Sequence, residues 1–151
     1  MQDRFSRFSY AITEISRHWH KLTADEMAKF GLKGTHCIYL LTLYQHPDGL
    51  TAPQLCTLCD RDKADVSRMT GIMEEKGLLS KEYAGSSKYR GVFRLTELGI
   101  QAAKQVQDRA SLAVSLAGRD MTEEAREVFY TSLESILKNL RQLSKQGLPD
   151  T

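Results

Sequence analysis

Residues 51–77 read TAPQLCTLCDRDKADVSRMTGIMEEKG, a pattern that predicts two short helices joined by a polar turn. Thr51 is a typical N-cap residue, and Gln54 three positions later completes a capping box. We expect Asp62 to cap the second helix, because its carboxylate can accept hydrogen bonds from the exposed amides at the positive helix end. The second helix is expected to end at Gly77, since glycine commonly terminates helices.

The second of these helices is expected to have one buried and one exposed face. The buried face would hold Val66, Met69 or Thr70, and Met73, which recur at helical spacing. The outward positions of its first half are Lys63, Asp65, Ser67 and Arg68. Cations and short hydrogen-bond donors at the start of a helix are what entry into a DNA major groove requires.

A hairpin and another helix are expected to follow. Residues 78–83 and 92–95 alternate in the manner of strands, around a Gly/Ser tip that carries Lys88 and Arg90. Thr96 is expected to cap a longer helix. The predicted order is therefore helix, turn, helix, basic hairpin and helix.

This order resembles the winged helix-turn-helix domain of the MarR/SlyA-type transcriptional regulators. Residues 62–68 resemble the start of the family's recognition helix, residues 75–78 the step into its wing, and residues 95–99 the step out. The family's wing usually carries an Asp-Arg-Arg-like triplet, whereas this chain has Ser87-Lys88-Tyr89 and then Arg90. The acidic residue that often braces the wing through a salt bridge is therefore absent.

The resemblance implies a mainly α fold: a winged helix-turn-helix with a two-stranded β-wing, and N- and C-terminal helices that form a dimerisation bundle. A chain of 151 residues suits a single domain over residues 1–151. Within it, residues 32–99 would form the DNA-binding part, and residues 1–30 and 100–146 the helical dimerisation part.

Both ends of the chain carry narrow apolar seams at heptad-like spacing. The N-terminal seam is Phe5, Phe8, Ile12, Ile15, Trp19 and Leu22; the C-terminal seam is Phe129, Leu133, Ile136, Leu140 and Leu143. Such helices can pack within one chain or across a two-fold axis between two chains. We favour a homodimer, because two recognition helices about 34 Å apart reach successive major grooves on one side of a duplex.

Composition is that of an ordinary soluble protein, with 41% hydrophobic and 26% charged residues. The net charge of +2 is small, but residues 51–96 hold eight Lys and Arg against six Asp and Glu, and the remainder balances. The surplus therefore lies in the predicted DNA-binding part. The sequence shows neither a signal-peptide core nor an apolar run of membrane-spanning length, so we expect a cytoplasmic protein.

The candidate DNA contacts lie on three expected elements. They are Thr51 and Gln54 at the first helix start, Lys63, Ser67, Arg68 and Thr70 on the second helix, and Lys88 and Arg90 on the wing. The two residues at the first helix start would reach phosphate, and the wing cations the minor groove or its backbone. For each cation, a solvated surface position is the alternative. Ser67 and Arg68 could equally contact phosphate, and Arg68 could instead form an ion pair with Asp62 or Asp65.

Five residues are candidates for a small-molecule pocket, because the family often binds an aromatic or phenolic effector between its dimerisation and DNA-binding parts. They are Arg17, Trp19, His20, His36 and Tyr39. A cation would meet a carboxylate, rings would stack, and imidazoles would form hydrogen bonds.

The cysteines have two interpretations. Cys56 and Cys59 share a helix face, which favours their use as small core residues. No second Cys-x-x-Cys and no nearby histidine pair completes a zinc site, so we expect no metal. A thiol sensor at Cys37 or at the pair is the alternative.

The sequence thus predicts a homodimeric, sequence-specific regulator of transcription that binds double-stranded DNA at a pseudo-palindromic operator, and that a small ligand relieves from repression. A winged-helix module for protein–protein contact and a cysteine-based redox regulator are the alternatives. The sequence shows no Gly-rich phosphate loop and no catalytic triad spacing, so we expect neither an enzyme nor a cofactor.

Overall fold

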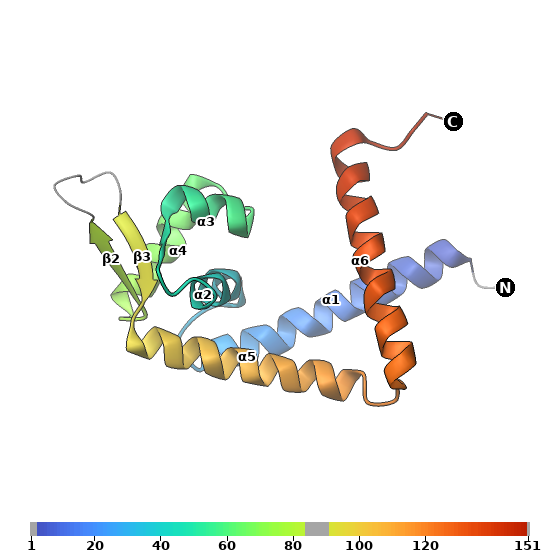
Figure 1. The fold of residues 1–151 in the computed structure, drawn as a ribbon, viewed down its shortest axis with the longest axis horizontal. Coiled ribbons are helices and arrows are strands. Elements are labelled where there is room, and N and C mark those ends of the chain that lie inside the picture. The colour runs from blue at the N-terminus through green and yellow to red at the C-terminus, as the bar shows by residue number, and fades with distance from the viewer. Residues whose placement is uncertain (1–2, 84–90, 151) are drawn as a thin grey trace. The chain divides into compact units, whose positions relative to one another are not determined.

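The computed structural model describes residues 3–83 and 91–150 (Figure 1). The elements follow in the order α1 (Arg4–Ala28), η1 (Gly34–His36), α2 (Cys37–Tyr44), β1 (Leu50–Thr51), α3 (Ala52–Cys59), α4 (Lys63–Glu75), β2 (Leu79–Tyr83), β3 (Gly91–Leu95), α5 (Glu97–Ala117) and α6 (Glu123–Gln146). The chain divides into two compact units, one up to Ser111 and one from Leu112, so that the boundary falls within α5.

Helices α3 and α4 form the predicted helix-turn-helix, and their starts are capped as expected. The hydroxyl of Thr51 accepts from the amide of Gln54 at 3.3 Å, while the Gln54 carbonyl oxygen accepts from the Thr51 amide at 2.8 Å. Asp62 accepts from the amide of Asp65 at 2.7 Å. Between the helices, Asp60 has a φ of 51°, the left-handed conformation that turns the chain sharply.

The wing strands belong to a three-stranded antiparallel sheet in the order β1-β3-β2. Strands β2 and β3 pair with Leu79 opposite Leu95, as the predicted two-stranded hairpin requires. The additional strand, β1, places Leu50 opposite Phe93. Gly49 makes this possible: its φ is +88°, and a Cβ there would lie 2.3 Å from Cγ1 of Val92.

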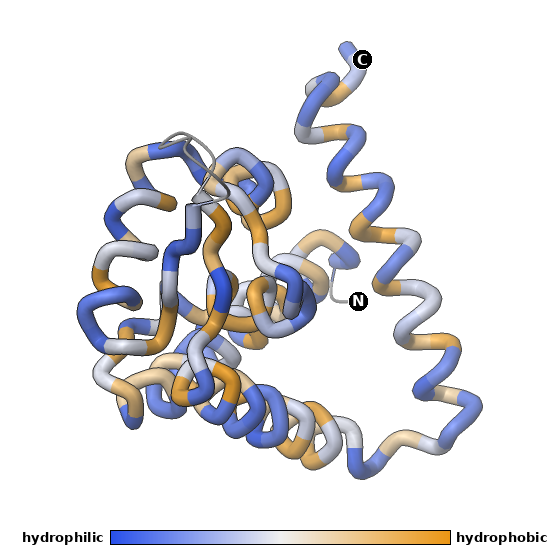
Figure 2. The backbone as a smooth tube through the Cα atoms, turned by 60° about the vertical axis from the view of Figure 1, so that its left-hand side comes forward, coloured by the Kyte–Doolittle hydropathy of each residue, from blue (hydrophilic) through white to orange (hydrophobic). Residues whose placement is uncertain are grey.

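The core lies in the first unit and draws on α1, α2, α3, α4, the sheet and α5. Its largest fully buried side chains are Met27, Tyr39, Leu40, Leu43, Leu55, Val66, Met73 and Val106. In Figure 2, hydrophobic residues, drawn in orange, alternate with hydrophilic ones along the tube. The spacing in α5 predicts an inward face made of Ile100, Ala103, Val106, Ala110, Ala113 and Leu116 or Ala117. Ala103 and Val106 are buried and the next two alanines are half-buried, but Ile100 and both candidates at the end of the helix are exposed. Ala102 is buried although the spacing did not include it.

The start of α5 lies against the end of α4 and the start of β2. Thr96 caps α5 by accepting from the amide of Gly99 at 3.1 Å, and its hydroxyl donates to the carbonyl of Gly77 at 2.6 Å. Its own amide donates to the carbonyl of Leu78 at 3.1 Å. Gly99 allows this close approach, since a Cβ there would lie 2.0 Å from the Leu78 oxygen.

The terminal helices expose their apolar seams. All six residues of the N-terminal seam on α1 are exposed, from 38% at Trp19 to 72% at Phe5. Met27 is the only buried residue of α1, and α6 has none. In Figure 2 the tube of α6 alternates between orange and blue along its length. Each seam is therefore a surface that a single chain leaves open to solvent.

Candidate nucleic-acid interface

The first half of α4 presents polar side chains to solvent. Lys63, Ser67 and Arg68 are all exposed, while Val66 and Met73 anchor the opposite side of the helix in the core. The capped turn before α4 fixes where this exposed surface begins. The surface carries two cations and a hydroxyl, which can contact phosphates and base edges.

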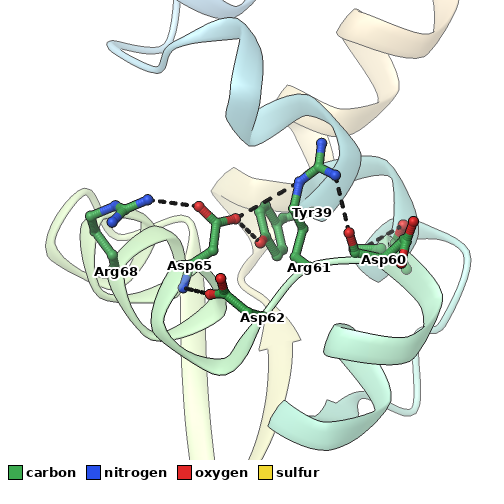
Figure 3. A network of polar contacts seen from close by, with 8 residues as sticks. Tyr39, Asp60, Arg61, Asp62, Asp65 and Arg68 are labelled. Carbon is green, nitrogen blue, oxygen red and sulfur yellow. Dashed lines mark hydrogen bonds and ion pairs between the residues drawn. The ribbon is translucent and has the colours of Figure 1, made fainter.

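Arg68 is not free on this surface, because its guanidinium pairs with the carboxylate of Asp65. Nη2 of Arg68 donates to Oδ1 of Asp65 at 2.7 Å, and the Arg68 side chain is 63% exposed (Figure 3). The two residues are three positions apart, so they lie on the same side of the helix. One of the two ion pairs that the sequence left open is thus present, whereas Asp62 serves as the cap.

The second oxygen of Asp65 faces the core. Oδ2 accepts a hydrogen bond from the hydroxyl of Tyr39, a fully buried residue of α2, and lies 3.9 Å from Nε of Arg61 (Figure 3). Burial raises the pKa of Tyr39, and the hydrogen bond to the Asp65 carboxylate raises it further. Tyr39 therefore remains a hydrogen-bond donor at every pH at which the protein is expected to work.

Thr70 does not belong to the exposed surface, which corrects its assignment as a DNA contact. The residue is only 2% exposed, and its hydroxyl donates to the carbonyl of Val66 at 2.7 Å. A threonine in a helix can satisfy its hydroxyl in this way without reaching solvent. Of the two alternatives for the buried face, Thr70 is the more deeply buried, and Met69 is half-buried.

Thr51 and Gln54 form two reciprocal hydrogen bonds with each other in the capping box, so the Thr51 hydroxyl and the Gln54 carbonyl oxygen are already engaged. Gln54 is exposed, whereas Thr51 is half-buried. The amide nitrogen of the Gln54 side chain is therefore the group of this pair best able to donate to a phosphate.

The predicted wing contacts Lys88 and Arg90 lie outside the described residues. Two further cations stand on the wing strands, and the sequence reasoning did not single them out. Nζ of Lys81 lies 5.1 Å from the ring centroid of Phe93, a cation–π distance. Nη1 of Arg94 lies 3.2 Å from Oε2 of Glu82. Both cations lie within residues 51–96, and they contribute to the surplus of positive charge that the sequence shows there.

The five candidate ligand residues have different surroundings. Arg17 and His20 are exposed on α1, where Arg17 pairs with Glu14 at 2.6 Å and His20 lies 3.2 Å from the Ser16 hydroxyl. Trp19 is 38% exposed and belongs to the apolar seam. The other two residues, His36 and Tyr39, are buried.

His36 has an incompletely satisfied imidazole. It is 2% exposed, its Nδ1 accepts from the Lys33 amide at 3.0 Å, and within the described part of the chain its Nε2 has no hydrogen-bond partner. Burial lowers the pKa of His36, because the charged imidazolium would lose its hydration. This residue lies in η1, directly before the buried side of α2.

The three cysteines are free thiols. Burial raises the pKa of Cys37 and of Cys59, which disfavours the reactive thiolate at both positions. The thiol of Cys59 lies 3.7 Å from the hydroxyl of Thr42. Among the described residues, no three His, Cys, Asp or Glu side chains gather as metal ligands would.

Residues 30–85 match the sequence model of the MarR family. They include η1, α2, α3, α4 and β2, and thus the whole helix-turn-helix. The fold is that of the MarR family. This confirms the resemblance found in the sequence, including its winged helix-turn-helix. A comparison with curated proteins finds no match.

Solved structures share the MarR fold over nearly the whole chain. A MarR-family regulator from Listeria monocytogenes, in complex with a 26mer DNA, is 20% identical with a TM-score of 0.77; the match covers 100% of this chain and 99% of that one. Staphylococcus aureus MepR bound to DNA is 21% identical with a TM-score of 0.77, covering 87% and 97%. A Methanosarcina mazei MarR regulator is 17% identical with a TM-score of 0.78, covering 91% and 99%.

Over residues 3–83 and 91–150, no helix combines the length and the apolar character that crossing a bilayer demands.

Proposed function

We propose that this protein is a sequence-specific regulator of transcription that binds double-stranded DNA through α4. The observation that carries the proposal is the exposed first half of α4, where Lys63, Ser67 and Arg68 stand on a capped helix-turn-helix. Two proteins with the same fold, from Listeria monocytogenes and Staphylococcus aureus, have structures with DNA bound. The cations of the wing strands would add phosphate contacts beside the major groove.

We further propose that the protein acts as a homodimer on a pseudo-palindromic operator. The apolar seams of α1 and α6 support this, because large aromatic and aliphatic side chains such as Phe5 and Leu140 are 72% and 46% exposed in the single chain. Exposed apolar surfaces of this extent commonly mark association sites. Pairing two chains would present two α4 helices to one duplex.

The regulatory part of the proposal is repression that a small aromatic ligand relieves. Arg17, Trp19 and His20 on α1 would supply a cation, a ring and a hydrogen-bonding group, and the buried His36 of η1 would supply a second imidazole. Tyr39 is fully buried and donates a hydrogen bond to Asp65, so a ligand would reach it only if α2 moved. A ligand that binds one spacing of the α4 helices better than another would shift the population and change the DNA affinity.

DNA binding can be tested by fluorescence anisotropy with a random duplex at low and moderate salt, followed by selection of preferred sites from genomic fragments. We expect affinity to fall steeply with salt, because phosphate neutralisation releases counterions. The selected sites should contain two half-sites with a fixed interval. Absence of salt-dependent binding would instead support a module for protein–protein contact. A regulator of this kind must reach chromosomal DNA, so we propose a cytoplasmic location.

The redox alternative is tested separately by counting free thiols before and after mild peroxide, with DNA affinity measured on the same samples. We expect unchanged affinity, because burial disfavours the thiolates of Cys37 and Cys59.

A further inference from the structure

Asp65 connects the protein core with the candidate DNA-reading surface. Its carboxylate has three partners: Oδ1 accepts from Arg68 at 2.7 Å, Oδ2 accepts from the buried hydroxyl of Tyr39, and Nε of Arg61 lies 3.9 Å from Oδ2 (Figure 3). Its own amide donates to Oδ1 of Asp62 at 2.7 Å. The side chain of Asp65 is only 20% exposed, whereas that of Arg68 is 63% exposed. This chain of contacts therefore runs from the buried Tyr39 in the core to the exposed guanidinium of Arg68 at the surface.

A role in stability explains little of this arrangement. An ion pair between residues three apart on a helix surface contributes little, because solvent screens it and both side chains lose freedom. Tyr39 lies 26 positions from Asp65 in the sequence and belongs to another helix, α2. A buried hydroxyl must find an acceptor, and here the only one it meets among the described residues is the carboxylate that also holds Arg68.

The contact with Asp65 limits the conformational freedom of the Arg68 side chain. A free arginine side chain samples many rotamers, and it must give up this freedom when it reads a base. The contact with Asp65 engages Nη2 and restricts the guanidinium before DNA arrives, so less freedom remains to be lost on binding. The carboxylate also places a negative charge close to any phosphate that α4 approaches. That charge opposes indiscriminate attraction to the DNA backbone.

We propose that Asp65 is a specificity-determining residue, which positions the guanidinium of Arg68 for base contact and is itself held in place by the hydroxyl of Tyr39. This inference rests on the proposed DNA-binding function. It assigns two separable effects to Asp65: a positional effect that requires Tyr39, and a charge effect that does not.

Three substitutions separate these effects. Asp65→Asn removes the charge and leaves one acceptor oxygen for two donors, so that Tyr39 and Arg68 compete for it. Asp62→Asn is the matched control: it removes the same charge three positions away and keeps the cap, because asparagine caps as well as aspartate. Tyr39→Phe removes only the hydroxyl and retains every charge.

The experiment uses a site selected with the wild-type protein and a random duplex of the same length. Dissociation constants for both are measured at one salt concentration by anisotropy, and their ratio gives the discrimination. Thermal unfolding of each variant sets a temperature at which all are folded. Salt must be constant, because the non-specific affinity depends on it strongly.

For Asp65→Asn we expect about twofold to fivefold tighter binding to the random duplex, and discrimination about tenfold lower, since one oriented base contact is lost. For Asp62→Asn we expect the same gain on the random duplex with unchanged discrimination. For Tyr39→Phe we expect unchanged affinity for the random duplex and discrimination about threefold to tenfold lower.

Two results would overturn the inference while leaving the proposed function intact. Wild-type protein could bind its selected site with both aspartate variants behaving alike, which would reduce Asp65 to a surface charge. Tyr39→Phe could also discriminate as well as wild type, which would remove the link to the core. If wild-type protein shows no salt-dependent DNA binding at all, the proposed function itself fails, and the inference fails with it.

Discussion

The hydroxyl of Thr96 donates a hydrogen bond of 2.6 Å to the carbonyl oxygen of Gly77, across the gap between the end of α4 and the start of α5. The same hydroxyl accepts from the amide of Gly99. One side-chain atom thus satisfies two backbone groups at helix ends, where orphan donors and acceptors are otherwise left to solvent.

Replacement of Thr96 by valine should therefore lower the free energy of unfolding by about 1–2 kcal/mol, because the helix cap and the hydrogen bond to Gly77 are lost together. Urea unfolding at a fixed protein concentration measures this. Thr96→Ser keeps the hydroxyl and should stay near wild type. A Thr96→Val variant as stable as wild type would show that the two hydrogen bonds contribute nothing to stability.

Replacement of Arg68 by alanine should reduce affinity for a selected DNA site by about 1–3 kcal/mol and relax the preference at one base position. Folding should be unaffected, because the Arg68 side chain is 63% exposed. A mobility-shift series over single-base variants of the site gives the measurement. Lys104→Ala, on an exposed part of α5, is the control and should bind as wild type does. Unchanged binding by the Arg68 variant would remove this residue from the interface.

Replacement of Lys63 by alanine should weaken binding to all sequences alike, because a phosphate contact carries no sequence information. The slope of log K against log salt should become shallower by about one unit. Titrations at several salt concentrations, with selected and random duplexes, provide both quantities. A loss confined to the selected site would indicate that Lys63 reads a base instead.

Replacement of Leu140 by glutamate should dissociate the proposed homodimer, because a charge would be placed within the apolar seam of α6. We expect the dimer dissociation constant to rise at least about 100-fold, which corresponds to roughly 3 kcal/mol. Sedimentation equilibrium measures this constant directly. Ser135→Glu adds the same charge on the opposite side of α6 and should leave the dimer intact. A wild-type protein that is already monomeric would contradict the proposed assembly.

Acidification should destabilise the protein through His36. Burial lowers its pKa in the folded state, and the charges of Lys33 and Lys76 act in the same direction, while Asp65 and the backbone of Lys33 oppose them. Between the folded pKa and the unfolded value near 6.5, the unfolded chain therefore binds more protons, so stability falls as pH falls.

The slope from His36 is at most about 1.4 kcal/mol per pH unit, and it vanishes above the unfolded pKa. Urea unfolding of wild type and of His36→Gln between pH 7.5 and about 5 tests this prediction. The variant should show a shallower pH dependence over the acidic part of the range. Parallel curves for the two proteins would show that His36 contributes nothing to acid sensitivity.

Local signals in the sequence were sufficient to predict the helix-turn-helix. The capping residues Thr51, Gln54 and Asp62 all act within three positions of their partners, so their spacing carried the necessary information. Strand β1 was not predicted, because its two residues are too short to show a period. It exists through pairing with β3, which lies about forty positions away in the chain.

The candidate interface was predictable only in part, for the same reason. Helical spacing identified Lys63, Ser67 and Arg68 as exposed, and it left open whether Met69 or Thr70 is buried. The back-bonded hydroxyl of Thr70 decides that question. The role of Asp65 depends on Tyr39, a contact between two helices that no local pattern contains. Tyr39 was instead predicted as a pocket residue, since aromatic character alone does not show where a side chain is buried.

Gly99 bears on how motion would travel through the first unit. A Cβ at this position would lie 2.0 Å from the carbonyl oxygen of Leu78, so α5 and the entrance to β2 touch backbone to backbone. No flexible side chain lies between them to absorb a displacement. We therefore expect a small displacement of the start of α5 to be passed directly to Leu78 and so to the first residues of β2.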